Sequence, residues 1–72
     1  MLHLEIPSDD DVVAVLNELG GRASAVRLRD RLIEVGHSES RSELAIQRAT
    51  DRSRIFICRD WTLSVQQEQQ VA

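Results

Sequence analysis

Apolar residues recur every three or four positions in the segment that follows Pro7. They fall on one face at the helical period, which predicts an amphipathic helix. Ser8 stands where an N-cap is expected, and its spacing to Asp11 is that of a capping box. Gly20-Gly21 follows the last apolar position and ends the helix. The apolar positions are Val12, Val15, Leu16 and Leu19.

A second helical pattern runs from Ser24, a candidate N-cap, to about Val35, and Gly36 ends it. The connector before it, residues 22–24, is expected to form a strand of two or three residues. The apolar face of this helix comprises Ala25, Leu28, Leu32 and Val35, widened on one side by Val26 and Ile33.

Residues 40–53 form a third helical pattern, with Ser38 or Ser40 as the N-cap. Its inner face consists of small residues and one isoleucine: Ser42, Ala45, Ile46, Ala49 and Ser53. Its outer face carries Ser40, Arg41, Leu44, Gln47, Arg48 and Asp51, with Arg52 at the margin. Leu44 therefore points away from the expected core. Glu43 and Asp51 have the spacing to pair with arginines of the same helix.

Two segments alternate with a period of two residues, which is typical of strands. Residues 2–6 predict a short strand that ends at Pro7. Residues 55–65 predict a β-hairpin, in which Trp61, Leu63 and Val65 share the inner face. The pattern indicates a very short turn, but Arg59-Asp60 is not a favoured two-residue turn, so a longer or an irregular loop is expected. Residues 66–72 lack core positions and are expected to be a flexible tail.

Length and composition indicate one small domain over residues 1–65. The net charge is −3, but the charges are unevenly distributed. Residues 1–21 hold no basic side chain, whereas residues 22–60 hold all nine arginines and a local balance of +3. The longest apolar run is too short to span a membrane. A single cysteine, Cys58, excludes an internal disulfide and fits a cytoplasmic protein, in which it is expected to be a buried apolar residue.

The sequence offers little to catalysis. The three soft ligand candidates, His3, His37 and Cys58, lie on separate elements without zinc-site spacing. The three aspartates at residues 9–11 diverge around a helix, so capping explains them better than a metal does. No glycine-rich phosphate loop is present. We expect no enzyme, no metal, no cofactor and no small-molecule substrate.

The order of elements resembles the winged helix-turn-helix superfamily over residues 8–65. The resemblance depends on Gly36 at the turn between helices two and three, and on the small residues Ala45 and Ala49. It also depends on the change of period at Arg54-Ile55 and on a hairpin whose second strand begins near Trp61. It implies an α+β domain of three helices and a C-terminal hairpin, the wing, with residues 2–6 as an additional strand.

The resemblance also implies that the third helix enters the major groove of double-stranded DNA, as in a small bacterial or phage-type transcriptional regulator. Arginine can pair with guanine, glutamine with adenine, and an apolar side chain can contact a thymine methyl. The base-reading candidates are Arg41, Leu44, Gln47 and Arg48. The phosphate-contacting candidates are Ser40, Arg22, Arg27, Arg52, Arg54 and Arg59. A homodimer, paired through the edge of residues 2–6, would double the contacts.

Two other interpretations remain open at the level of sequence. An outer helix face rich in arginine and glutamate is often only a solvated surface, and a single exposed leucine such as Leu44 is common. The same fold can also serve as a protein-interaction module that does not bind DNA, which the acidic first helix and the negative net charge favour.

Overall fold

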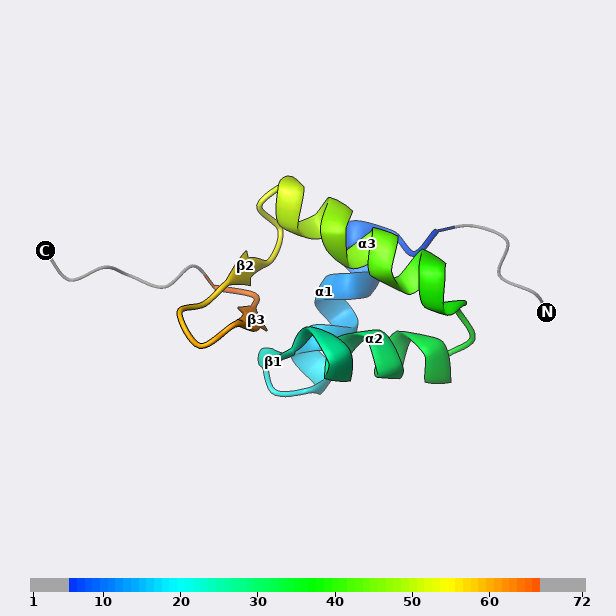
Figure 1. The fold of residues 1–72 in the computed structure, drawn as a ribbon, viewed down its shortest axis with the longest axis horizontal. Coiled ribbons are helices and arrows are strands. Elements are labelled where there is room, and N and C mark those ends of the chain that lie inside the picture. Colours follow the sequence, from blue (N-terminus) through cyan, green and yellow to red (C-terminus); the bar gives the residue numbers. More distant parts are fainter. Residues whose placement is uncertain (1–5, 67–72) are drawn as a thin grey trace, which may run out of the picture.

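The computed structural model describes residues 6–66, which form three helices and a small antiparallel sheet (Figure 1). This arrangement confirms the predicted α+β class and the predicted order of elements. The predicted strand at residues 2–6 lies, apart from Ile6, outside the described residues, and so does the tail beyond Gln66. The elements are α1 (Asp9–Glu18), β1 (Arg22–Ser24), α2 (Ala25–Glu34), α3 (Glu39–Asp51), β2 (Phe56–Ile57) and β3 (Thr62–Ser64).

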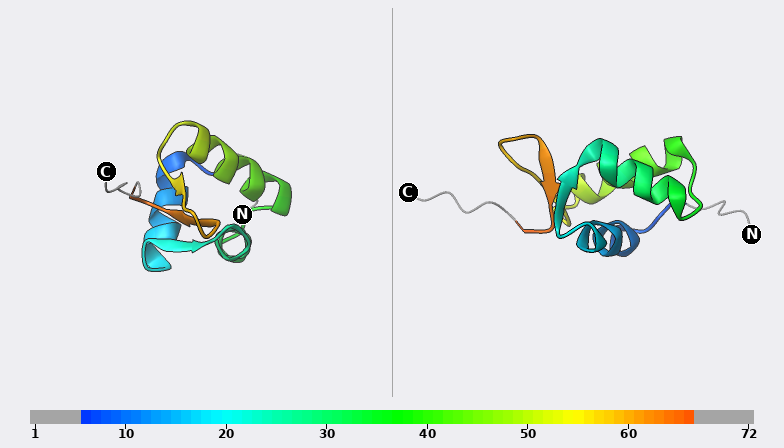
Figure 2. Two further views of the ribbon diagram at one scale, coloured as in Figure 1. Left: turned by 60° about the vertical axis from the view of Figure 1, so that its left-hand side comes forward. Right: turned by 90° about the horizontal axis from the view of Figure 1, so that it is seen from below.

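The sheet has the strand order β1-β3-β2, with both pairs antiparallel. Leu63 is the central position, because it pairs with Ala23 on one side and with Ile57 on the other. The sheet lies at one end of the helices, and the loop between β2 and β3 projects from it on the side away from α1 (Figure 2). The hairpin therefore stands beside the α2–α3 pair.

Each helix begins at a serine N-cap. Ser8 and Asp11 form the complete predicted capping box, and Ser24 accepts a hydrogen bond from the backbone of Arg27. Ser38 caps α3 by accepting from the backbone N–H of Arg41. Ser40 is consequently a residue of the first helical turn and not the cap.

Each helix also ends in the same way, with two backbone hydrogen bonds that close a Schellman motif. Gly20 and Gly36 supply the left-handed residue after α1 and α2, at φ 96° and 114°. Ser53 does so after α3, at φ 61°. The prediction that Ser53 continues the inner face of α3 is therefore wrong, because the chain has already left the helix and Ser53 is exposed.

The core lies where the three helices meet the sheet. Its largest fully buried side chains include Leu16, Leu28, Leu32 and Ile55. The predicted apolar face of α2 is too wide, because only a narrow stripe of this helix faces its neighbours. Leu28 and Leu32 form that stripe, and the other predicted members are exposed: Ala25, Val26, Ile33 and Val35.

Ser42 provides a test of the core. Its Oγ is buried without a hydrogen-bond partner among the described residues, and alanine is the better helix former. Ser42→Ala should therefore raise the free energy of unfolding by about 1 kcal/mol, measured by thermal or urea unfolding. Ser38→Ala is the matched comparison and should lower it by about 1 kcal/mol, because it removes an N-cap. A destabilised Ser42→Ala variant would show that the hydroxyl makes a stabilising contact.

Candidate nucleic-acid interface

The outer face of α3 is solvent-facing as predicted. Ser40, Gln47 and Arg48 are exposed, Leu44 is 36% exposed, and Arg41 is half-buried. Within residues 6–66, the Arg48 guanidinium has no ion-pair partner. The four base-reading candidates therefore lie along one helix, and three of them, Leu44, Gln47 and Arg48, are exposed to solvent.

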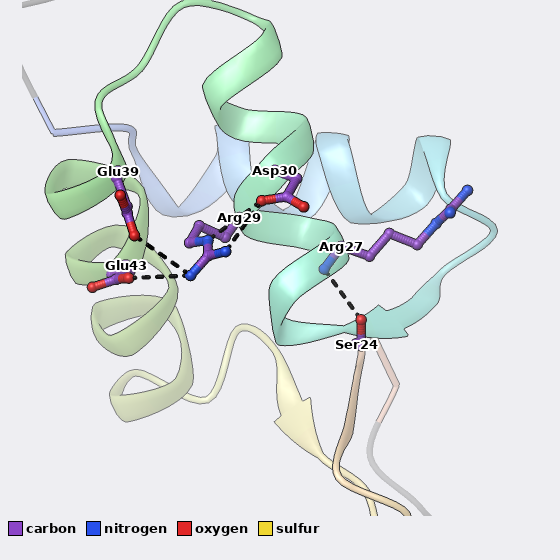
Figure 3. A network of polar contacts seen from close by, with 6 residues as sticks. All are labelled: Ser24, Arg27, Arg29, Asp30, Glu39 and Glu43. Atoms are coloured by element: carbon purple, nitrogen blue, oxygen red, sulfur yellow. Dashed lines mark hydrogen bonds and ion pairs between the residues drawn. The ribbon is translucent and has the colours of Figure 1, made fainter.

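The acidic side chains at the start of α3 lie beside an arginine of α2. Arg29 lies 3.6 Å from a carboxylate oxygen of Glu39 and 3.5 Å from one of Glu43 (Figure 3). It also contacts Asp30 on its own helix at 3.3 Å. The hydrogen bond to Asp30, followed by the nearby carboxylates, raises the pKa of Arg29. Both glutamates thus face a positive group of the protein itself.

Arg27 lies on the same helix as Arg29 but extends away from this cluster (Figure 3). The structure records a hydrogen bond from its backbone N–H to Ser24, while its side chain is exposed.

The end of α3 is connected to the start of α1 by two ion pairs. Arg52 lies 3.1 Å from Asp9, and Arg54 hydrogen-bonds Asp10. Two of the predicted phosphate contacts, Arg52 and Arg54, are thus engaged with carboxylates of α1.

Pairing with Arg48 and Arg52 is one of the roles open to Glu43 and Asp51, and residues 6–66 do not show it. Glu43 contacts Arg29 on α2, and Arg52 contacts Asp9 on α1. The ion pairs of α3 therefore join it to the other two helices.

A polar network joins the loop of the wing to β1. The Asp60 carboxylate accepts hydrogen bonds from the backbone N–H and the hydroxyl of Thr62, at 3.2 and 2.6 Å. Arg22 of β1 donates to the same hydroxyl at 2.9 Å and lies 3.6 Å from Asp60. The hydroxyl of Thr62, followed by its backbone N–H, lowers the pKa of Asp60. Arg22 is therefore part of the wing's own structure.

The wing loop has three residues, Arg59 to Trp61, closed by the hydrogen bond from the Trp61 N–H to the Cys58 carbonyl. This confirms a loop longer than two residues. The prediction that Trp61 faces the core is wrong: it is 80% exposed and adopts φ 66°. The third loop residue leaves the strand alternation, so the indole does not share the buried side of Leu63. Cys58 is buried as expected.

A groove that the sequence did not indicate lies between α2, α3 and the wing. It has a volume of about 450 Å³, and its surface is mostly apolar. Val26 and Ile57, which are 55% and 57% exposed, form part of its wall. The lining residues are Ala25, Val26, Arg29, Glu43, Ile46, Gln47, Thr50, Asp51, Ile57 and Leu63.

Over residues 6–66, no three histidine, cysteine or acidic side chains come together as a metal site. None of the helices in this part of the chain is long and apolar enough to cross a membrane. Comparison with protein-family models, curated proteins and solved structures gave no match to this chain.

The polar network of the wing loop gives a titration test. Asp60 remains ionised below its ordinary pKa of 3.8. Its contribution to stability is present above that pH and is lost as the pH falls through the lower folded-state pKa. Thr62→Val removes the largest cause, so the pKa of Asp60 should rise toward 3.8, measured by NMR titration of the carboxyl carbon.

The matched control for this titration is Thr50→Val. The Thr50 hydroxyl donates to the Ile46 carbonyl and makes no recorded contact with Asp60, so the pKa of Asp60 should stay unchanged. Equal values in Thr62→Val and the wild type would contradict the assignment.

Proposed function

We propose that this protein binds double-stranded DNA in a sequence-specific manner as a small transcriptional regulator, with α3 in the major groove. The observation that carries the proposal is the outer face of α3. It presents Leu44, Gln47 and Arg48 to solvent, with the half-buried Arg41 at the start of the same face, along about two helical turns. A major groove admits one α-helix, and these side chains match the hydrogen-bonding and methyl groups on base edges.

The ion pairs of α3 support its approach to DNA although the whole chain carries −3. Glu39 and Glu43 would repel phosphates, but both lie beside Arg29 of α2. A cation at this distance offsets part of the field of the two carboxylates. Arg48 lies on the outer face of the same helix and has no carboxylate partner among residues 6–66.

The acidic start of α1 is offset in the same way. Asp9 lies against Arg52 and Asp10 against Arg54. Charges that are paired at short distance contribute little to the field several ångströms away. The aspartates of α1 therefore oppose the approach of DNA less than the net charge indicates.

Flanking groups supply the phosphate contacts in this arrangement. Arg27 extends from α2, Ser40 lies in the first turn of α3, and Arg59 lies in the wing loop. Such contacts add affinity without sequence information. Three further candidates lie against carboxylates of the protein and would contribute by exchanging a carboxylate for a phosphate: Arg22, Arg52 and Arg54.

The proposal predicts a selective effect of Arg48. Arg48→Ala should weaken binding to a selected duplex by about ten-fold or more, because one bidentate base contact is worth about 1–3 kcal/mol. The matched control is Arg31→Ala, which removes the same charge from α2, where Arg31 pairs with Glu18 and Glu34. Fluorescence anisotropy with labelled DNA measures both, and the melting temperature should be nearly unchanged in both. Equal losses of DNA affinity in the two variants would show that the interaction is a nonspecific effect of charge.

Salt dependence tests the same proposal independently. Affinity for a mixed-sequence duplex should fall steeply as the salt concentration rises, because phosphate contacts release counterions. Absence of binding at low salt would overturn the proposal and would favour the protein-interaction module instead.

A further inference from the structure

Trp61 occupies a position in the wing loop that normally belongs to glycine. In three-residue hairpin loops the last residue adopts a left-handed conformation, which side chains with a Cβ resist. Trp61 adopts φ 66°, yet its side chain is 80% exposed and belongs to no part of the core. Within residues 6–66, the indole is not part of the buried core, so no core contact there compensates for the backbone conformation. Strain of this kind at an exposed residue is typical of a functional contact.

The same chain carries an apolar groove with no occupant among residues 6–66. The groove of about 450 Å³ is large enough for an indole, and its walls include Val26, Ile46, Ile57 and Leu63. Val26 and Ile57 are more than half exposed, although both are large aliphatic side chains. Exposed apolar surface that surrounds a concave site marks an interaction surface.

Trp61 and the groove are also matched in charge. Arg59 is exposed in the same loop as Trp61, whereas the groove is lined by two carboxylates, Glu43 and Asp51, and by one cation, Arg29, which lies 3.5 Å from Glu43. An indole entering the groove would bring the loop arginine toward a wall with one more carboxylate than cation. Trp61 does not fill the groove of its own chain, because its side chain is 80% exposed.

We propose that Trp61 of one chain inserts into the α2–α3–wing groove of a second copy, and that the second copy reciprocates. One indole and one groove per chain satisfy two-fold symmetry, in which each contact occurs twice and the assembly closes as a dimer. Tryptophan and arginine are among the residue types that most often anchor interfaces. Two indoles cover less surface than a standard interface needs, so the dimer is weak and concentration-dependent. This proposal does not depend on DNA binding.

Trp61 is the chain's single tryptophan, and the chain has no tyrosine. The 72-residue Trp61→Gly chain therefore has almost no intrinsic fluorescence in the tryptophan emission band, and glycine suits the left-handed position. We expect this variant to melt no lower than the wild type. A trace of wild-type protein, titrated with a large excess of the Trp61→Gly chain, should show tryptophan emission moving to shorter wavelength and iodide quenching falling.

Two double variants test whether the spectral shift comes from the groove or from any exposed apolar surface of the partner. A titrant carrying Trp61→Gly and Val26→Asp should lose the spectral shift, because the charge lies in the groove wall. Aspartate is acceptable to the fold there, since position 26 is exposed and lies in the first turn of α2. A titrant carrying Trp61→Gly and Val35→Asp should retain the shift, because Val35 is 41% exposed at the end of the same helix but outside the groove.

Three outcomes would overturn the proposal. The first is a wild-type spectrum that does not change with the Trp61→Gly titrant or with wild-type concentration. The second is a shift with wild-type concentration alone, which would place the two indoles against each other. The third is a shift that survives Val26→Asp, which would place Trp61 elsewhere on the partner. Sedimentation velocity on the wild type and on Trp61→Gly measures the corresponding loss of dimer.

Discussion

The structure depends on the close approach of α3 to the other two helices. The residues that α3 turns inward are Ser42, Ala45 and Ala49, none more than 1% exposed. Small side chains let helix axes come close, and they leave little room for a long side chain in the contact. Every long residue of α3 except Ile46 must therefore lie at the flanks or on the outer face. Arg48, Gln47 and Leu44 are exposed because the inner contact is small.

The second constraint comes from charges that pair between elements. Arg29 joins α2 to α3, and Arg52 and Arg54 join the end of α3 to the start of α1. Exposed ion pairs of this kind add little to stability individually. Their effect on the surface is larger, because they determine which charged side chains remain available to a partner. Arg48 remains available among the described residues, whereas Arg52, about one helical turn later, is engaged with Asp9.

The periodicity of the sequence is sufficient to predict the helices and strands, but it does not predict which residues of different elements contact one another. Helix positions, the capping box at Ser8 and the exposure of Leu44 follow from local spacing, which a single sequence contains. The contact between Arg52 and Asp9 joins residues 43 positions apart, and no local pattern encodes such a pair. The exposure of Trp61 could not be predicted from the sequence for a different reason. One additional loop residue reverses the alternation of a strand, so an error in loop length moves a side chain from the core to solvent.

The groove and the outer face of α3 share two residues, Gln47 and Asp51, and this links the two proposed activities. Gln47 lines the groove and is also a candidate reader of base edges. A second copy whose indole occupies the groove would lie against Gln47 and restrict the approach of DNA to α3. Two ligands that compete for one surface lower each other's apparent affinity by the same factor. Self-association would then store the protein in a form that does not bind DNA, and a suitable DNA site would release the monomer.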